Sequence, residues 1–172
     1  MDQTSTTDVD QGHVLELYDD EPWLVEIGRA MSVAISQGSA VVCITTDAHW
    51  RLLERHVVDC GIDIHAARAK GHIARLDAER TLSKISGDGS IDVVRFAEVV
   101  GAVIDGVSTR HLRVWIYGEL VALMRAHGDH AGAIDLEKLW SSFTTVRPMF
   151  RSFTSCTPLA PVRDCGQNKA RF

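Results

Sequence analysis

The order of apolar and polar positions along the chain predicts alternating strands and helices. Apolar and β-branched runs predict strands at residues 14–18, 40–45, 62–66, 73–76 and 112–117. Residues 40–45 form one continuous apolar run, which is typical of a strand buried on both faces of a parallel sheet. Apolar residues at helical spacing predict helices that begin at Pro22, at Thr46 or Asp47, at Asp77, at Ser90 or Asp92, after Gly118 and after Asp129.

This alternation indicates the fold class and the limits of the domain. We expect an α/β protein, a three-layer sandwich with a mostly parallel central sheet and right-handed crossovers, over residues 13–147. Residues 1–12 contain three aspartates, no basic residue and no apolar core, which predicts a disordered leader rather than a secretory signal. Residues 148–172 are expected to be an irregular basic tail, with at most an edge strand at residues 149–154.

Composition narrows the class of protein. The chain has 172 residues, of which 45% are hydrophobic and 24% charged, as in ordinary globular domains. The formal net charge of -5 argues against direct binding of nucleic acid. No apolar run approaches the ~18 residues that a membrane-spanning helix needs, so we expect a cytoplasmic protein without membrane contact. The basic tail is expected to be solvated, with contact to an acidic partner surface as the alternative.

Several catalytic motifs are absent from the sequence. A P-loop (Walker A) needs a lysine after a glycine-rich loop, yet the first lysine is Lys70, and residues 18–22 carry three carboxylates instead. The fingerprints G-x-G-x-x-G and G-x-S-x-G are absent as well. The eight histidines show no metal-ligand spacing, and a Gly-Asp turn separates His127 from His130. We therefore expect no metal, no cofactor and no enzymatic activity.

The strongest candidate for a binding site is the junction at residues 112–119, where a strand ends and a helix begins at once. Ligands of open α/β sheets bind at the carboxyl ends of strands, so Tyr117 and Glu119 are candidate ligand-binding residues. Tyr18 and Asp19 are candidates for the same reason. The alternatives are a structural Glu119 in a first helical turn, where the dipole favours negative charge, and tyrosine rings that belong to the core. Two arginines precede this strand and are expected to be solvated rather than anion-binding, namely Arg110 and Arg113.

Five blocks of the sequence occur in a characteristic order. They are His13-Val14 with Tyr18-Asp19-Asp20, and residues 47–51, 71–78, 114–121 and 136–140. Together they resemble the MEDS domain, a sensory domain named for methanogens, methylotrophs and the dichloromethane-responsive repressor, from His13 to about Phe143. The resemblance implies a RecA/KaiC-like core that has lost its P-loop and senses a small molecule or a partner. It also implies that the His13 segment lies near the pocket, and it supplies no catalytic residue.

The end of the chain departs from this family. The family closes with an apolar strand, whereas Arg151, Ser152 and Thr154 interrupt the corresponding run. An absent last strand would expose a neighbouring sheet edge, which homodimerisation could cover. No output domain adjoins the resemblance in this sequence, so we expect the domain to act as a free module or through a partner.

Three hypotheses for the function follow. The first is a stand-alone sensory module of bacterial signal transduction, which binds a small ligand or a partner such as a histidine kinase, an anti-sigma factor or a transcription regulator. The second is a degenerate nucleotide-binding protein with no NTPase activity, or a residual metal-assisted one through Glu119 and the Asp19-Asp20 pair. The third is a pure interaction module. On the first hypothesis, Glu119→Gln is expected to weaken the ligand response with little change in melting temperature.

Overall fold

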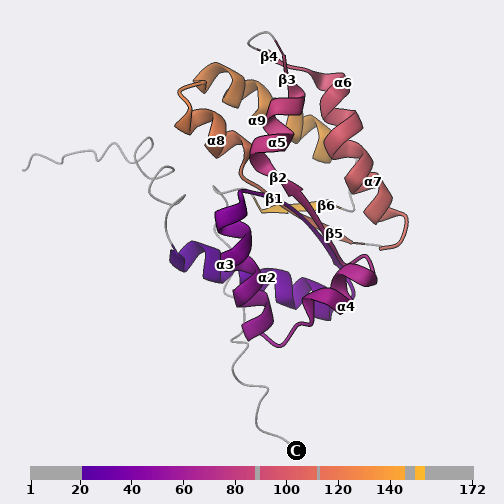
Figure 1. Ribbon diagram of the computed structural model, residues 1–172. Helices are drawn as coiled ribbons and strands as arrows, with labels where there is room; N and C mark the ends of the chain where they lie inside the picture. The colour runs from indigo at the N-terminus through magenta and orange to yellow at the C-terminus, as the bar shows by residue number, and fades with distance from the viewer. Residues whose placement is uncertain (1–20, 88–89, 112, 146–149, 154–172) are drawn as a thin grey trace, which may run out of the picture.

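The computed structural model describes residues 21–87, 90–111, 113–145 and 150–153, and it has a small parallel sheet at its centre (Figure 1). Each pair of neighbouring strands in this sheet is parallel, in the order β2-β1-β5-β6. The four strands are β1 (Ala40–Thr45), β2 (Ile73–Asp77), β5 (Val114–Gly118) and β6 (Phe150–Phe153). A separate antiparallel hairpin joins β3 (Ser86–Gly87) to β4 (Ser90–Ile91).

Helices cover both faces of the sheet (Figure 1). The helices on the first face are α2 (Glu21–Ser36), α3 (Asp47–Asp59) and α4 (Ile64–Ala69). Those on the second face are α5 (Ala78–Ile85), α6 (Val93–Phe96), α7 (Ala102–Ser108), α8 (Leu120–Ala126) and α9 (His130–Thr145). A π-helical segment, η1 (Ala97–Gly101), lies between α6 and α7. The protein is therefore a mixed α/β structure with a parallel sheet flanked by helices, as the alternation of strands and helices predicted.

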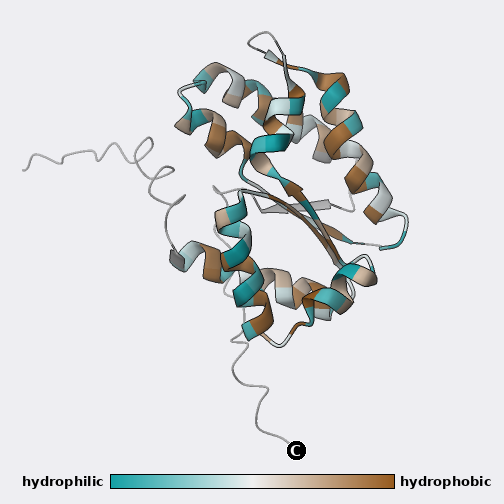
Figure 2. Ribbon diagram, viewed as in Figure 1, coloured by the Kyte–Doolittle hydropathy of each residue, from teal (hydrophilic) through white to brown (hydrophobic). Residues whose placement is uncertain are grey.

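The central strand β1 divides the core into two halves. All six of its residues are buried, which matches the continuous apolar run in the sequence. Side chains alternate across the sheet, so Val41 and Cys43 pack against the layer of α2, α3 and α4, while Val42 and Ile44 pack against the opposite layer. Figure 2 shows the hydrophobic central strand between helices that carry both hydrophobic and hydrophilic residues.

Short polar side chains set the starts of several helices. Thr46 caps α3 by accepting a hydrogen bond from the His49 amide, and Asp77 caps α5 by accepting one from the Arg80 amide. Asp92 caps α6 in the same way. These three residues were among the helix starts predicted from the sequence, and the predictions are confirmed.

One local prediction was wrong. Residues 62–66 were expected to form a strand, but α4 begins at Ile64 because the Asp63 carboxylate accepts a hydrogen bond from the Ala66 amide and starts a helical turn. The segment is too short for its apolar periodicity to distinguish a strand from a helix.

Several of the predictions concern the two ends of the chain. The expected leader, the expected strand at residues 14–18 and most of the tail lie outside the described residues. Within the segment expected to be irregular, β6 pairs with β5 in parallel and forms an edge of the described sheet. No helix in the described part of the chain combines the length and apolar character needed to cross a membrane.

Candidate functional site

The candidate site lies where β1 and β5 end. From the end of β1 the chain continues into α3 on one face of the sheet, and from the end of β5 it continues into α8 on the other face. Adjacent strands whose following helices leave in opposite directions create a crevice at their carboxyl ends, where α/β proteins bind ligands. The residues at this edge come from the two turns, Thr46 to His49 and Gly118 to Glu119.

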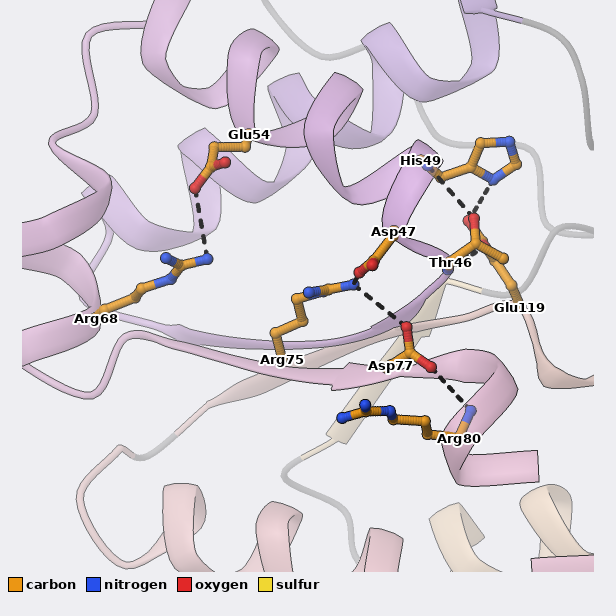
Figure 3. Close-up of polar contacts among 9 residues, drawn as sticks. All are labelled: Thr46, Asp47, His49, Glu54, Arg68, Arg75, Asp77, Arg80 and Glu119. Atoms are coloured by element: carbon orange, nitrogen blue, oxygen red, sulfur yellow. Dashed lines mark hydrogen bonds and ion pairs between the residues drawn. The ribbon is translucent and has the colours of Figure 1, made fainter. Parts of the chain in front are cut away.

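Glu119 is the central residue of this site. It is only 3% exposed, although it is an acidic residue at the start of a helix. Its Oε2 accepts a hydrogen bond from the Thr46 amide at 3.0 Å, and its Oε1 lies 2.9 Å from His49 Nδ1 (Figure 3). Because a carboxylate oxygen can only accept, this contact places the proton of the imidazole on Nδ1.

Tyr117 adds a third donor to the same carboxylate. Its hydroxyl donates to Glu119 Oε1 at 3.1 Å, and its side chain is 3% exposed. The ring packs in the core on the α3 side of the sheet, in register with Cys43. The Tyr117 ring is therefore part of the core, as the structural alternative supposed, and its hydroxyl reaches the carboxyl edge, where its role as a ligand-binding residue stays a prediction.

The Glu119 side chain stabilises a helix other than its own. Glu119 stands at the amino end of α8, yet its carboxylate makes no capping hydrogen bond there. It binds instead at the amino end of α3, where the helix dipole favours a negative charge. The structural alternative considered above placed the carboxylate at the start of the helix that follows Glu119, whereas its hydrogen bond lies at the start of α3.

A second polar group lies beside the first, around Arg75 on β2 (Figure 3). Its guanidinium contacts the Asp47 carboxylate closely and lies 3.6 Å from Asp77 Oδ2. The hydrogen bond from Arg75, together with its positive charge, lowers the pKa of Asp47 below its usual value. The same guanidinium stacks on the Trp50 ring at 5.6 Å, where Arg68 lies 5.1 Å from the ring centroid.

Two buried polar atoms at this edge have no hydrogen-bond partner among the residues that the structure describes. They are Thr45 Oγ1, at the end of β1, and Arg75 Nε. Thr45 stands in register with Asp77 on β2 and directly precedes the capping residue of α3. Buried polar groups are normally satisfied, so this edge has hydrogen-bonding capacity that the described residues leave unused.

The structure brings together two of the five residues predicted for the site. Tyr117 and Glu119 are hydrogen-bonded, whereas Tyr18, Asp19 and His13 lie outside the described residues. Thr46 and His49 were not among the residues predicted for the site, because Thr46 was expected to begin a helix and the histidines show no metal-ligand spacing. Their position directly after a fully buried strand was the available signal, because the carboxyl ends of neighbouring parallel strands meet at one edge.

In the part of the chain that the structure describes, no three histidine, cysteine, aspartate or glutamate side chains are grouped so that they could hold a metal ion. A separate open depression of about 700 Å³, lined by Ser86, Gly87, Ser90, Asp92 and Arg95, lies at the β3–β4 hairpin instead. The site therefore consists of a buried, hydrogen-bonded carboxylate with an arginine and two aspartates at its rim.

Comparisons with known proteins do not identify this chain. No family model, no curated protein and no solved structure matches it.

Proposed function

We propose that the chain is a sensory or regulatory module of bacterial signal transduction, which binds a small ligand or a regulatory partner at the carboxyl edge of its sheet. The observation that carries this proposal is the Glu119 carboxylate, which joins the start of α8 to the start of α3. A ligand that takes over one of its hydrogen bonds changes the connection between two helices on opposite faces of the sheet. Such a change is a means of transmitting occupancy to the protein surface.

The MEDS resemblance supports the same proposal and adds a finer one. On this view the sheet is the core of a RecA/KaiC-like domain without a P-loop, and the protein works in the cytoplasm without catalysing a reaction. The partner protein that responds to its conformational state would be a histidine kinase, an anti-sigma factor or a transcription regulator. Tyr18, Asp19 and His13 would complete the pocket around Tyr117 and Glu119.

The geometry argues against the nucleotide-binding alternative. In nucleotide-binding α/β proteins a phosphate commonly lies at the amino end of the helix that follows a strand. Here that position at α3 is taken by Glu119 Oε2, 3.0 Å from the Thr46 amide. A phosphate would have to displace a buried carboxylate of the same sign, so we expect no thermal stabilisation by ATP or GTP with Mg²⁺. A nucleotide at 100 times its dissociation constant would instead stabilise the protein by about 2.7 kcal/mol.

Native mass spectrometry of the full chain, purified from its own host, tests the proposal. We expect a co-purifying small molecule or partner, whose occupancy falls in Tyr117→Phe, a variant that keeps the ring and removes only the hydroxyl. Glu137→Gln is the matched control, because Glu137 pairs with Arg125 on the second face of the sheet. A wild-type spectrum that shows only the monomeric chain, with no bound small molecule or partner, would contradict the proposal. A dimer without ligand would favour the pure interaction module.

A further inference from the structure

A basic cluster lies at the opposite, amino end of the strands. Figure 1 shows α4, and the chain that leaves the end of α7, near the first residues of the sheet. The backbone confirms this arrangement, because the His72 carbonyl accepts from the Val41 amide and the Arg113 carbonyl accepts from the Ala40 amide. The amino-edge cluster consists of Lys70, His72, Arg110, His111 and Arg113.

The three cations of this cluster are not neutralised within the described residues. Lys70, Arg110 and Arg113 are exposed, and none of them forms an ion pair with the part of the chain that the structure describes. The chain as a whole has a formal net charge of -5, whereas these three unpaired cations make the amino edge locally positive. Their positive potential favours an anion there.

Two nitrogen atoms converge on one point above Gly71. An ideal Cβ at Gly71 would lie 3.5 Å from Arg110 Nη1 and 3.7 Å from His111 Nε2. Gly71 has a φ of 74°, which side chains rarely adopt, and it carries no Cβ that would separate the two nitrogens from its backbone.

Neither nitrogen has an acceptor among the described residues. His111 Nε2 is buried without a hydrogen-bond partner there, and Arg110 makes no side-chain hydrogen bond to a described residue. The His111 ring packs against the His72 ring, with centroids 4.5 Å apart, and His72 Nδ1 lies 2.9 Å from the Ser39 carbonyl oxygen. Because a carbonyl only accepts, His72 donates from Nδ1 and is fixed in orientation. The His111 ring is therefore positioned in advance, beside the exposed Arg110.

We propose that this amino-edge cluster is an oxyanion site, which takes a phosphate group between Arg110 and His111 above Gly71. Guanidinium and imidazole donors form short, charge-assisted hydrogen bonds to phosphate oxygens, and Lys70 and Arg113 add attraction at longer range. The group is either inorganic phosphate, a soluble phosphomonoester or a lipid headgroup. The site lies at the other end of the strands from Glu119, so it does not depend on the function proposed above.

Titration of the full chain with inorganic phosphate at constant ionic strength tests the site. The NMR signals of the imidazole rings report the binding. We expect saturable shifts of the His72 and His111 signals, and an affinity about tenfold weaker in Arg110→Gln, because one charge-assisted hydrogen bond is lost. His111→Gln should weaken binding similarly. Arg55→Gln removes another exposed arginine, on α3, and should leave the affinity unchanged.

The outcomes separate the proposal from nonspecific attraction. Shifts that do not saturate, that chloride reproduces, or that persist in Arg110→Gln would overturn it. Amide spectra of each variant show that the fold is intact. Sedimentation with phosphatidic acid vesicles distinguishes the sources of phosphate. Co-sedimentation that is abolished in Arg110→Gln assigns the site to a lipid headgroup. Binding of inorganic phosphate without co-sedimentation assigns it to a soluble phosphate.

Discussion

The carboxylate of Glu119 accepts a hydrogen bond from the backbone amide of Thr46, 73 residues earlier in the chain, at 3.0 Å. This bond joins the first residues of two helices that lie on opposite faces of the sheet. The Tyr117 hydroxyl and His49 Nδ1 bind the same carboxylate. Glu119 is thus both the best candidate for ligand contact and a structural connection.

This environment changes what the conservative substitution of Glu119 should do. Three donors bind the Glu119 carboxylate. In Glu119→Gln the new side-chain NH2 group must face at least one of these donors, so at least one buried hydrogen-bond donor is left without an acceptor. We expect the free energy of unfolding to fall by about 1–3 kcal/mol, rather than the small effect expected from the sequence. Urea denaturation measures the change.

Glu137→Gln is the control for this experiment. Glu137 is partly exposed and pairs with Arg125, and such pairs contribute about 1 kcal/mol or less. Equal losses in the two variants would show that the buried hydrogen bonds of Glu119 contribute little to stability.

Substitution by alanine should have opposite effects at two glycines, one in the contact between α2 and α3 and one on α7. A Cβ at Gly28 would lie 2.7 Å from His56 Cβ, so Gly28→Ala must push the two helices apart. We expect a loss of about 1–3 kcal/mol in the free energy of unfolding. A Cβ at Gly106 on α7 would meet nothing within 4 Å, so Gly106→Ala should instead stabilise by about 0.5–1 kcal/mol. Thermal or urea unfolding of both variants gives the two signs, and a shared sign would refute the packing argument.

The elements that the sequence predicted correctly depend on local chemistry. Thr46, Asp77 and Asp92 cap helices through bonds to amides two or three residues away, so a short window contains the whole signal. The central strand β1 was equally clear, because burial on both faces requires a continuous apolar run. The error at α4 arose because Ile62 and Ile64 alternate as they would in a strand, while the Asp63 cap starts a helix.

The candidate site could be predicted only in part. Tyr117 and Glu119 are two residues apart near the end of a strand, and that spacing places them on one face. The contacts of Glu119 with Thr46 and His49 depend on which strands are neighbours, and no local pattern specifies that β5 lies beside β1. For the same reason, Arg110 and His111 could not be related to Gly71, which lies before a different strand.

The thiol of Cys43 should be unreactive in the folded protein. Burial raises its pKa from 9.0 to about 12, and its Sγ lies 3.7 Å from Met31 Sδ. We expect iodoacetamide at pH 8 to modify the half-buried Cys60 but not Cys43, and to modify both in denaturant. Peptide mass spectrometry measures each site. Rapid labelling of Cys43 in the native protein would contradict the packing of β1 against α2.

The same thiol predicts a pH dependence of stability. The folded protein holds the Cys43 proton more tightly than the unfolded chain does, so this contribution is complete below pH 9.0 and is lost as the pH rises toward about 12. The loss approaches about 1.4 kcal/mol per pH unit. Cys43→Ala should remove this part of the slope. An unchanged slope would assign the alkaline loss to other groups.

The Asp47 carboxylate should report on the rim of the candidate site. Its pKa is lowered chiefly by the hydrogen bond from Arg75, and Arg80 makes the smallest of the contributing effects. Arg75→Gln is therefore expected to raise the pKa of Asp47 toward its ordinary value of 3.8, and Arg80→Gln to raise it much less. Carbon-detected NMR titration of the Asp47 carboxyl group measures both shifts.

The direction of the Asp47 shift also fixes its effect on stability. A carboxyl group whose pKa is lowered on folding stabilises the folded state above its ordinary pKa, and this contribution is lost as the pH falls below 3.8 through the lowered native value. Arg75→Gln should flatten this acid dependence. At neutral pH its cost should come chiefly from the lost contacts of the guanidinium with Trp50 and Asp77, because the ion pair with Asp47, which is 68% exposed, contributes little. If Arg80→Gln flattened the acid dependence equally, the effect would come from the summed positive charge of the rim. A larger effect of Arg75→Gln would show that one directed bond holds Asp47 against β2, beside the end of the strand where a ligand would bind.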